Sequence, residues 1–482
     1  MSRSPGNGSA ATSVSWWLVY TVVGAGWFVV NAIVIVMQRR PAASTIAWLM
    51  VMVFVPVLGF LAYLLIGPLR LERRKRKHSR SKRLVDEGLR GLARLDARWA
   101  GHHQLAMLSI GGGGEPPLAA ESVEIYLDGA STYDAILEAI AAAHDHVHVE
   151  YYIWEADTIG TRLRDALIER ARAGVTVRVI LDGTGCRLSR SFLRPLREAG
   201  ATVVWFNPVH LWTLRRRRID LRCHRKIVVC DGRVGFTGGM NISDLHSAKL
   251  SDPYWRDTHL RLAGTAVWPL QRLFFEDWYY AAEELIPVTE KTVPPPAHEG
   301  EHLVQIVGSG PDTLDFALHK LFFTAITGAT KRVWLTTPYF VPDDALLAAL
   351  LTAVLRGVDV RVLIPKRGDS RLVDLAARSY FPELLDAKIR IYEYEPRFIH
   401  AKTMVVDDDV SIVGTANFDN RSFRLDFELA AVLFGETANR TLVSAFETDV
   451  RDSREVTRDD LAKLSFVQRL GSSTARLFSP LL

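Results

Sequence analysis

The same arrangement of histidine, lysine and aspartate occurs twice in this 482-residue chain. The H-x-K-x4-D residues are His224, Lys226 and Asp231 in the first copy and His400, Lys402 and Asp407 in the second. Each copy continues to an asparagine at the same offset from its histidine, Asn241 or Asn417. Duplicated imidazole, ammonium and carboxamide groups at matched spacing predict one phosphate-handling site built from two half-sites.

This set of side chains suits displacement at a phosphodiester. A neutral histidine can attack phosphorus and form a phospho-histidine. A second, protonated histidine can give its proton to the leaving alkoxide and then deprotonate the incoming alcohol or water. Two lysines and two asparagines would stabilise the phosphate oxygens in place of a metal, so we expect neither a metal nor another cofactor. The residues alone do not distinguish His224 from His400 as the nucleophile.

The acidic residues near the motifs have two possible roles. Asp231 and Asp407 stand in turn sequences, where a structural role is as well supported as a catalytic one. Glu428 and Asp257 become equivalent when the strand sequences that contain them are aligned. An acid that holds the second nitrogen of a catalytic histidine would select its tautomer. We therefore add Asp257 and Glu428, with Asn241 and Asn417, to the predicted site as orienting or phosphate-binding residues.

The elements around the motifs repeat as well, and "AGVTVRVIL" in the first half matches "RGVDVRVLI" in the second. We expect helices at 133–143, 162–172, 314–327 and 345–355, and strands at 146–153, 175–181, 333–337 and 358–364. Each motif is predicted to lie on a strand, 224–229 or 400–406, so that its His and Lys face the same side. Strands alternating with helices predict an α/β fold of two tandem domains, each a mixed sheet flanked by helices.

The N-terminal region predicts a membrane anchor. Two uncharged stretches, about 16–37 and 45–66, each have the roughly 20 apolar residues of a transmembrane helix. Pro56 predicts a kink in the second, and a re-entrant second segment is the alternative. Nine Lys or Arg residues follow between positions 70 and 83. The positive-inside rule then places the remaining chain in the cytoplasm, and the same cluster would attract anionic lipid.

Composition and linker sequences divide the chain into four parts. A content of 48% hydrophobic and 23% charged residues is typical of a folded protein, and three cysteines without a C-x-x-C pair argue against a disulfide framework. Gly- and Pro-rich breaks separate the later parts. The predicted parts are a membrane anchor at 1–69, a basic segment and linker at 70–117, and two similar domains at 118–290 and 300–482.

The paired motifs resemble the phospholipase D superfamily and, within it, the bacterial cardiolipin synthases. The resemblance rests on "CHRKIVVCDGRVGFTGGMNIS", "YWRDTHLRLAG", "TTPYFVPDDALLAAL" and "IHAKTMVVDDDVSIVGTANFDNRSFRLDFE", and it covers nearly the whole chain. It implies a two-lobed fold, a site between the lobes, and transfer of a phosphatidyl group between two phosphatidylglycerol molecules with release of glycerol. It also implies that the six motif residues form the active site and favours His224 as nucleophile. Cys223 and Asp426 replace asparagines that are common in such enzymes.

Two other classes of function remain open. The first is a hydrolase on the same scaffold, either a membrane phospholipase D or a nuclease, and the second is a non-catalytic membrane scaffold. Intact duplicate motifs argue against a scaffold. A membrane anchor argues against a nuclease, so nucleic acid is not an expected partner. The expected partners are phosphatidylglycerol and anionic lipid of the bacterial inner membrane, while the residues do not indicate an oligomeric state or an acceptor preference.

Overall fold

The computed structural model describes residues 16–37, 42–66, 103–111, 114–208, 221–295, 300–311 and 316–482. The chain divides into two compact units. The first comprises Met1–Arg70 with Leu214–Arg218, and the second comprises Leu71–Thr213 with Ile219–Leu482. The duplicated motifs lie entirely in the second unit.

Three apolar helices form the described part of the first unit: α1 (Trp16–Val36), α2 (Ala42–Phe54) and α3 (Pro56–Ile66). Ile35, Met52 and Tyr63, one from each helix, are buried against one another. The expected second stretch is interrupted between α2 and α3, where Pro56 begins the new helix. A proline has no backbone N–H to donate into the preceding turn, so the predicted kink at this position is a break between two shorter helices.

Within the described residues, no helix has both the length and the apolar character required to cross a membrane. The expected pair of transmembrane helices is therefore not confirmed. The basic cluster at 70–83 lies outside the described residues.

Fifteen strands of the described second unit form one continuous sheet. The first half contributes β1 (Leu118–Tyr126), β2 (His146–Tyr151), β3 (Thr176–Asp182), β4 (Thr202–Phe206), β5 (Ile227–Cys230), β6 (Val234–Gly238) and β7 (His259–Gly264). The second half contributes β8 (His302–Ser309), β9 (Arg332–Thr336), β11 (Asp359–Pro365), β12 (Arg390–Tyr394), β13 (Thr403–Val406), β14 (Val410–Gly414), β16 (Glu428–Phe434) and β17 (Ser453–Glu455). A separate ladder pairs β10 (Phe340–Val341) with β15 (Phe418–Asp419).

The strand order makes the two halves near-copies of each other. Outward from the centre, the first half runs β1-β7-β6-β5-β2-β3-β4 and the second runs β8-β16-β14-β13-β9-β11-β12, followed by β17 at the edge. β1 and β8 join antiparallel at the centre. In the first half β2, β3 and β4 are parallel, and in the second half β9, β11 and β12 are parallel. The strands nearer the centre and the edge strand β17 pair antiparallel. The predicted duplicated α/β fold is thus confirmed, with one shared sheet instead of two separate ones.

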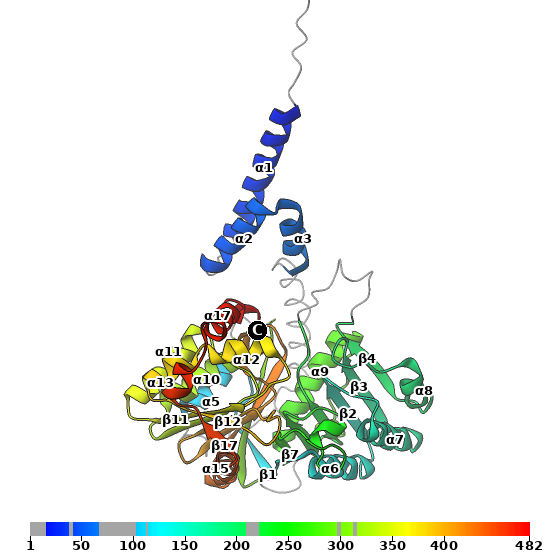
Figure 1. The fold of residues 1–482 in the computed structure, drawn as a ribbon. Coiled ribbons are helices and arrows are strands. Elements are labelled where there is room, and N and C mark those ends of the chain that lie inside the picture. Colours follow the sequence, from blue (N-terminus) through cyan, green and yellow to red (C-terminus); the bar gives the residue numbers. More distant parts are fainter. Residues whose placement is uncertain are drawn as a thin grey trace, which may run out of the picture. The chain divides into compact units, whose positions relative to one another are not determined.

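Helices cover both faces of this sheet (Figure 1). They are α5 (His103–Gly111), α6 (Gly129–Ala141), α7 (Thr158–Arg172), α8 (Arg190–Glu198), α9 (Trp268–Ala282), α10 (Ala317–Gly328), α11 (Asp344–Leu355), α12 (Arg371–Arg378), α13 (Phe381–Asp386), α14 (Asn420–Arg424), α15 (Glu436–Arg451), α16 (Arg458–Ala462) and α17 (Phe466–Arg476). Helices α6–α8 and α10–α13 bury separate cores, one for each half. Helices α9 and α15 cover a core on the other face that continues across both halves.

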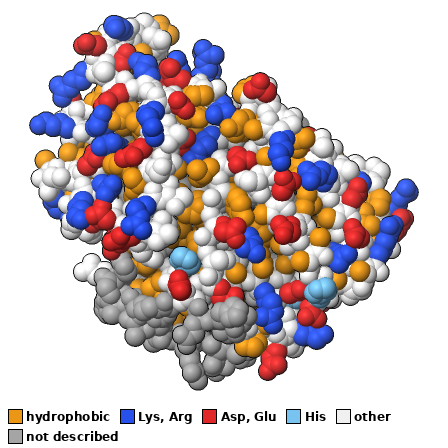
Figure 2. Space-filling view, turned by 90° about the horizontal axis from the view of Figure 1, so that it is seen from below, with side chains coloured by type: hydrophobic (Ala, Val, Ile, Leu, Met, Phe, Trp, Pro, Cys, Tyr) orange, Lys and Arg blue, Asp and Glu red, His pale blue; other side chains and the backbone are white. Residues whose placement is uncertain are grey.

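The surface charge is mixed on the face that Figure 2 shows, where acidic and basic side chains are interspersed between apolar ones. A single broad area of positive charge, which is typical of nucleic-acid-binding surfaces, is not visible on that face.

Candidate active site

The two histidine segments lie immediately before β5 and β13, not on these strands as expected. Each segment is held by the opposite half of the unit. The backbone N–H of His224 donates to the carbonyl of Phe427 at 2.9 Å, and that of His400 donates to the carbonyl of Arg256 at 2.7 Å. Isolated bridges link Cys223 with Phe427 and Arg256 with Ile399. Both histidines therefore lie where the two halves meet.

The histidine–carboxylate pairs cross between the halves. Nδ1 of His224, in the first half, lies 2.9 Å from Oε1 of Glu428 in the second. Nδ1 of His400, in the second half, lies 2.6 Å from Oδ2 of Asp257 in the first. The acids hold equivalent places, because Asp257 lies two residues before β7 and Glu428 begins β16, the counterpart of β7. Neither half contains both a motif histidine and the acid that holds it.

This arrangement determines the histidine tautomers. Nδ1 of His224 lies close to two acceptors, the Glu428 carboxylate and the Thr415 carbonyl at 3.1 Å. Nδ1 must therefore carry the hydrogen, and Nε2 keeps the lone pair that a nucleophile or base requires. The Asp257 carboxylate imposes the same tautomer on His400.

Two buried lysines accompany the histidines. Nζ of Lys226 donates to the carbonyl of His224 at 2.8 Å, and Nζ of Lys402 donates to that of His400 at 2.6 Å. Each ammonium has two further hydrogens to donate. The Lys226 ammonium also lies 5.7 Å from the centre of the Tyr152 ring, which packs edge-on against His224. The two motifs thus place matched cations beside matched imidazoles.

Burial sets the protonation of these groups. It lowers the pKa of Lys226 to about 8 and that of Lys402 to about 7, although nearby carboxylates oppose the shift. Burial also lowers the pKa of His224, against the opposing charge of Glu428. Burial and the neighbouring lysines lower the pKa of His400 well below its usual value. Both histidines are therefore neutral at neutral pH in the unliganded protein.

The asparagines of both motifs are buried at equivalent places. Among the described residues, the side-chain oxygens of Asn241 and Asn417 have no hydrogen-bond partner. Their backbone N–H groups are occupied: that of Asn241 donates to Nε2 of His246, and that of Asn417 donates to Oγ of Ser422. The backbone is fixed, while the side-chain oxygens remain without a donor in the described part of the chain.

The motif aspartates lie elsewhere, at the other end of the motif strands. Asp231 follows β5 and accepts hydrogen bonds from the backbone N–H groups of residues 144–146, each at 2.8 Å. Asp407 follows β13 and accepts from those of residues 330–332, at 2.7 to 3.1 Å. Both have positive φ, 54° and 49°. The structure does not bring them to the histidines, because a strand of about 3.3 Å per residue separates the two ends.

Sequence reasoning missed two residues that lie beside the acids. In the second half, the hydroxyl of Thr415 donates to Glu428. The equivalent position in the first half is Gly239, where any Cβ would collide with Oδ1 of Asp257. His246 lies nearby, with Nδ1 3.6 Å from Oδ2 of Asp257, which is longer than a hydrogen bond. The sequence did contain a sign of the role of His246, since His246 and Ser422 stand at the same offset from Asn241 and Asn417.

Two buried clusters of the described residues have donor atoms that could hold a metal ion. One is His246, Asp257 and His400, which belongs to the site above. The other is Glu150, Cys223 and Asp277. In that second cluster Arg225 already pairs with Asp277, and the Cys223 thiol donates to Glu150 at 2.7 Å. Burial and the charge of Asp277 raise the pKa of Glu150 well above its usual value, so this cluster is neutralised by a proton and an arginine.

The departures from the common pattern at Cys223 and Asp426 are both buried beside the site. Asp426 pairs with Arg421 at 3.1 Å. Burial raises the pKa of Asp426 well above its usual value, although Arg421 opposes the shift. Neither residue replaces a member of the crossed pairs.

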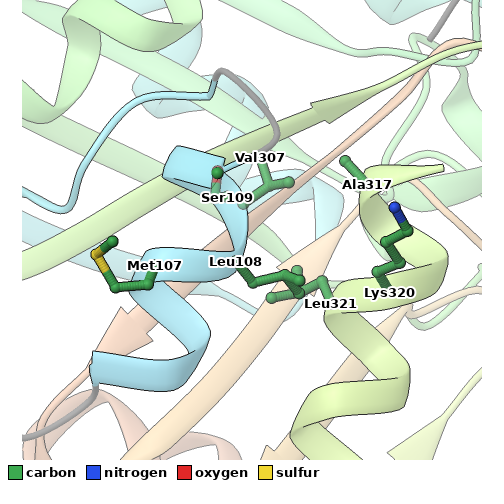
Figure 3. A pocket seen from close by; sticks show the side chains of 8 residues that line it. Met107, Leu108, Ser109, Val307, Ala317, Lys320 and Leu321 are labelled. Atoms are coloured by element: carbon green, nitrogen blue, oxygen red, sulfur yellow. The ribbon is translucent and has the colours of Figure 1, made fainter. Parts of the chain in front are cut away.

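Two pockets lie outside this constellation. One, of about 280 Å³, opens between α5 and α10, where Leu108 and Leu321 point toward its interior (Figure 3). The other, of about 700 Å³, lies where the halves meet and is lined by Arg256 and Arg397, among others. Neither is lined by the catalytic candidates themselves.

Comparison with known proteins identifies the family. A family profile described as "Cardiolipin synthase, PLD-like domain" matches residues 136–248 and 322–450, and one described as "Phospholipase_D-nuclease N-terminal" matches 26–68. The chain is 40% identical over 481 residues to a cardiolipin synthase of Alkalihalophilus pseudofirmus, covering 97% of this chain and 95% of that one. The chain belongs to the cardiolipin synthase family. A "Cardiolipin synthase 2" of Bacillus anthracis is 41% identical and covers 94% of this chain and 90% of its own length.

The fold is also found among solved structures. The crystal structure of phosphatidylserine synthase from Haemophilus influenzae superposes with a TM-score of 0.61 at 14% identity, over 79% of this chain and 100% of that one. It shares the two-lobed fold of the cardiolipin synthase family. The resemblance drawn from the paired motifs is thus confirmed at the level of family and fold.

Proposed function

We propose that this protein is a cardiolipin synthase that transfers a phosphatidyl group from one phosphatidylglycerol to another, releasing glycerol. The observation that supports this most strongly is the crossed pair of histidine–carboxylate contacts beside two buried lysines. It supplies a nucleophile, an acid–base group and a cationic phosphate site in one place. Its chemistry fits the names of the full-length relatives.

The first half-reaction would proceed at the phosphate of the donor lipid. Nε2 of His224 attacks phosphorus, and the bond from phosphorus to the glycerol headgroup oxygen breaks. His400 gives the departing oxygen a proton, so glycerol leaves as a neutral alcohol. Because His400 is neutral in the free protein, it gains this proton when the anionic phosphate binds and raises its pKa. The family resemblance favours His224 as the nucleophile. If the two histidines exchanged roles, the same bonds would form and break and the same protons would move.

The second half-reaction reverses these proton movements. A headgroup hydroxyl of the second phosphatidylglycerol enters where glycerol left, and His400 removes its proton. The hydroxyl oxygen attacks phosphorus, and the phosphorus–nitrogen bond to His224 breaks. Lys226, Lys402 and the carboxamides of Asn241 and Asn417 would donate to the phosphate oxygens in both steps, and one such donor contributes about 10² to 10³ in rate.

The first 69 residues would hold this site at the bacterial inner membrane. Helices α1, α2 and α3 contain no charged side chain. The sequence of 70–83 carries the positive charge that the positive-inside rule associates with the cytoplasmic side. We therefore also propose that this region crosses the membrane twice and that the two catalytic domains, at 118–290 and 300–482, lie in the cytoplasm. A second lipid headgroup is concentrated there, which favours alcohol over water as acceptor.

The proposal is tested with purified protein and phosphatidylglycerol in mixed micelles, following lipids and glycerol by mass spectrometry. Cardiolipin with equimolar glycerol is the expected result, and activity should persist in a chelator. Phosphatidic acid as the sole lipid product would instead assign a hydrolase of the phospholipase D type. A marked loss of activity in chelator would show that one of the two buried donor clusters holds a metal.

The lysines predict an alkaline limit to activity. As pH rises through about 7 to 8, Lys402 and then Lys226 lose their charge, so kcat/KM for phosphatidylglycerol should fall. The acid limit should lie below the usual histidine value of 6.5, because burial lowers the pKa of the histidine that must be neutral. A pH profile of kcat/KM measures both limits in the free enzyme. In Lys402→Arg the lower of the two alkaline ionisations should disappear from the pH profile, because arginine keeps its charge. A flat profile of the unaltered protein from pH 7 to about 9.5 would contradict the assignment of these ionisations to the two lysines.

We assign Asp231 and Asp407 to the turns rather than to the reaction. Asp407→Ala leaves three backbone N–H groups without their acceptor and should destabilise the fold by about 1–3 kcal/mol. Per folded molecule, kcat should change less than about threefold, because the side chain lies away from the histidines. Thermal unfolding and kcat are measured together. Asp408→Ala is the matched control, since Asp408 is exposed and pairs only with Lys331 and Arg332 among the described residues; a large kcat loss confined to Asp407→Ala would restore a catalytic role.

A further inference from the structure

The C-terminal segment, residues 466–482, exposes an unusual amount of apolar surface. The large apolar side chains that are more than a third exposed there are Phe466, Val467, Leu470, Leu477, Phe478 and Leu481. Single exposed apolar residues are ordinary, but a contiguous group marks a surface that meets a partner or a membrane. We call this group the C-terminal apolar face.

The orientation of α17 shows that this exposure is built into the helix. At about 100° per residue, Phe466, Leu470 and Leu477 project within about 40° of one another, and Ala475 projects on the opposite side. Ala475 is 3% exposed and packs in the core, whereas Phe466 and Leu477 are 71% and 78% exposed. A helix that only completed the core would turn its large apolar side chains inward. Here the small residue faces the protein and the large ones face out.

The charges beside this face suit an anionic surface. Arg469 and Arg476 are the only ionisable side chains from Phe466 to Leu482 in the sequence, so the segment contains no acidic residue. Both arginines project from one flank of α17. Arg476 lies over the Tyr380 ring at 4.3 Å and pairs with Glu383 at 3.4 Å while its side chain remains 40% exposed. Large apolar residues bordered by arginines are the pattern of helices that lie in the interface of anionic membranes.

The segment is joined to the wall of the active site. Its last turn, η5 (Ser479–Leu481), packs on α14: the N–H of Arg421 donates to the carbonyl of Leu482 at 2.9 Å, and Nδ2 of Asn420 donates to that of Ser479 at 3.2 Å. The next residue of α14, Ser422, receives the backbone N–H of the site residue Asn417. A surface that binds to 466–482 is thereby held next to the phosphate site.

We infer that the C-terminal apolar face is a membrane-docking surface that inserts into the interface of an anionic phospholipid bilayer and holds the catalytic unit against it. The inference rests on the proposed function for the nature of the substrate, which lies in that bilayer. The N-terminal anchor only tethers the catalytic unit, and docking at the C-terminus orients it. The flanking arginines, in a segment without an acidic residue, favour an anionic lipid surface over a second protein.

Depth-dependent quenching tests the docking directly. In the full-length protein, Leu470→Cys and Leu477→Cys are labelled with an environment-sensitive fluorophore; the three native cysteines are buried and should not react. The protein is reconstituted into vesicles of phosphatidylethanolamine and phosphatidylglycerol with brominated or ordinary acyl chains. We expect at least about twofold quenching by bromine at both positions. Leu355→Cys, at an equally apolar and 86% exposed position on α11, is the control and should not be quenched.

The other outcomes overturn the inference. Equal emission in brominated and ordinary vesicles at 470 and 477 would show that the face stays in water. A blue-shifted emission without bromine quenching would show that a second copy or another protein covers it. The quenching does not depend on catalysis, so a docked protein that makes no cardiolipin would remove the proposed function and leave the docking surface in place.

Activity provides a second measurement. The triple variant Phe466→Ser/Leu470→Ser/Leu477→Ser should lose about 10-fold in cardiolipin synthesis from vesicles, because the productive orientation is less populated. In detergent micelles with the same lipid it should stay within about twofold of the unaltered protein, since a micelle can reach the site from any direction. Leu355→Ser should match the unaltered protein in both. An equal loss in vesicles and micelles would indicate a folding defect and contradict a docking role.

Discussion

His224→Ala and His400→Ala should each lower kcat by at least about 10⁴-fold while the protein still folds, because each removes a group that makes or breaks a bond. Both histidines are neutral and only slightly exposed. Alanine at either position therefore leaves a small cavity, and the partner carboxylate is the one charged group that loses its contact. Cardiolipin formation is measured in micelles, and folding by the thermal transition. Full activity in either variant would refute a site made of two half-sites.

A matched control exists in the same chain. His319 also pairs with a carboxylate, its Nε2 2.8 Å from Oδ2 of Asp343, on α10 and away from the crossed pairs. His319→Ala should keep turnover within about threefold. The two catalytic variants should also differ from each other. With a donor lipid whose leaving group is p-nitrophenol, which departs without a proton, mass spectrometry after a denaturant quench at neutral pH should find a phosphatidyl group on His224 in His400→Ala and none on His400 in His224→Ala. The opposite result would exchange the two roles.

Asp257→Asn and Glu428→Gln should each lower kcat by about 10² to 10⁴, because each amide permits the wrong tautomer of the histidine that it holds. The crossed contacts predict which defects belong together. A donor lipid with a p-nitrophenyl leaving group needs no proton from an acid. The burst of nitrophenol should therefore recover in His400→Ala and in Asp257→Asn, but not in His224→Ala or Glu428→Gln.

This grouping is a test of the tertiary contacts, since Asp257 lies closer in sequence to His224 than to His400. If the Asp257→Asn burst behaved like that of His224→Ala, the crossed pairing would be wrong. If His400 is the nucleophile, all four bursts exchange while the pairing remains. Asp343→Asn, which alters the pair with His319, is the control and should show an unaltered burst.

Much of the fold could be predicted because its signals are local. The repeated "GVxVRV" strands and their flanking helices have periodicities that short segments display by themselves, and β3 and β11 lie within a residue or so of their predicted bounds. The expected helices correspond to α6, α7, α10 and α11 with small shifts at their ends. The union of both halves in one sheet through β1 and β8 had no such signal, because strand pairing over a long sequence separation depends on tertiary packing.

The candidate site divides in the same way. His224, Lys226, Asn241 and their counterparts could be recognised from residue type and spacing, since phosphate transfer requires such groups in matched number. The place of Asp231 and Asp407 was not decided by spacing alone: only the strand that separates them from the histidines, and the three N–H groups each accepts, show what they contact. His246 shows the limit most clearly, because only the tertiary structure shows that it lies beside Asp257 and accepts the backbone N–H of Asn241.

The sequence by itself determined that two matched motifs exist, which chemistry their side chains could perform and which family the chain resembles. These properties depend on residue types at fixed offsets along the chain, and no folding is needed to see them. Only the tertiary structure decided that each histidine takes its carboxylate from the other half, and that the last helix turns its large apolar residues outward. Both depend on how segments that are distant in sequence pack together. The free energy of contact between their surfaces selects that arrangement, and neighbours in the sequence do not.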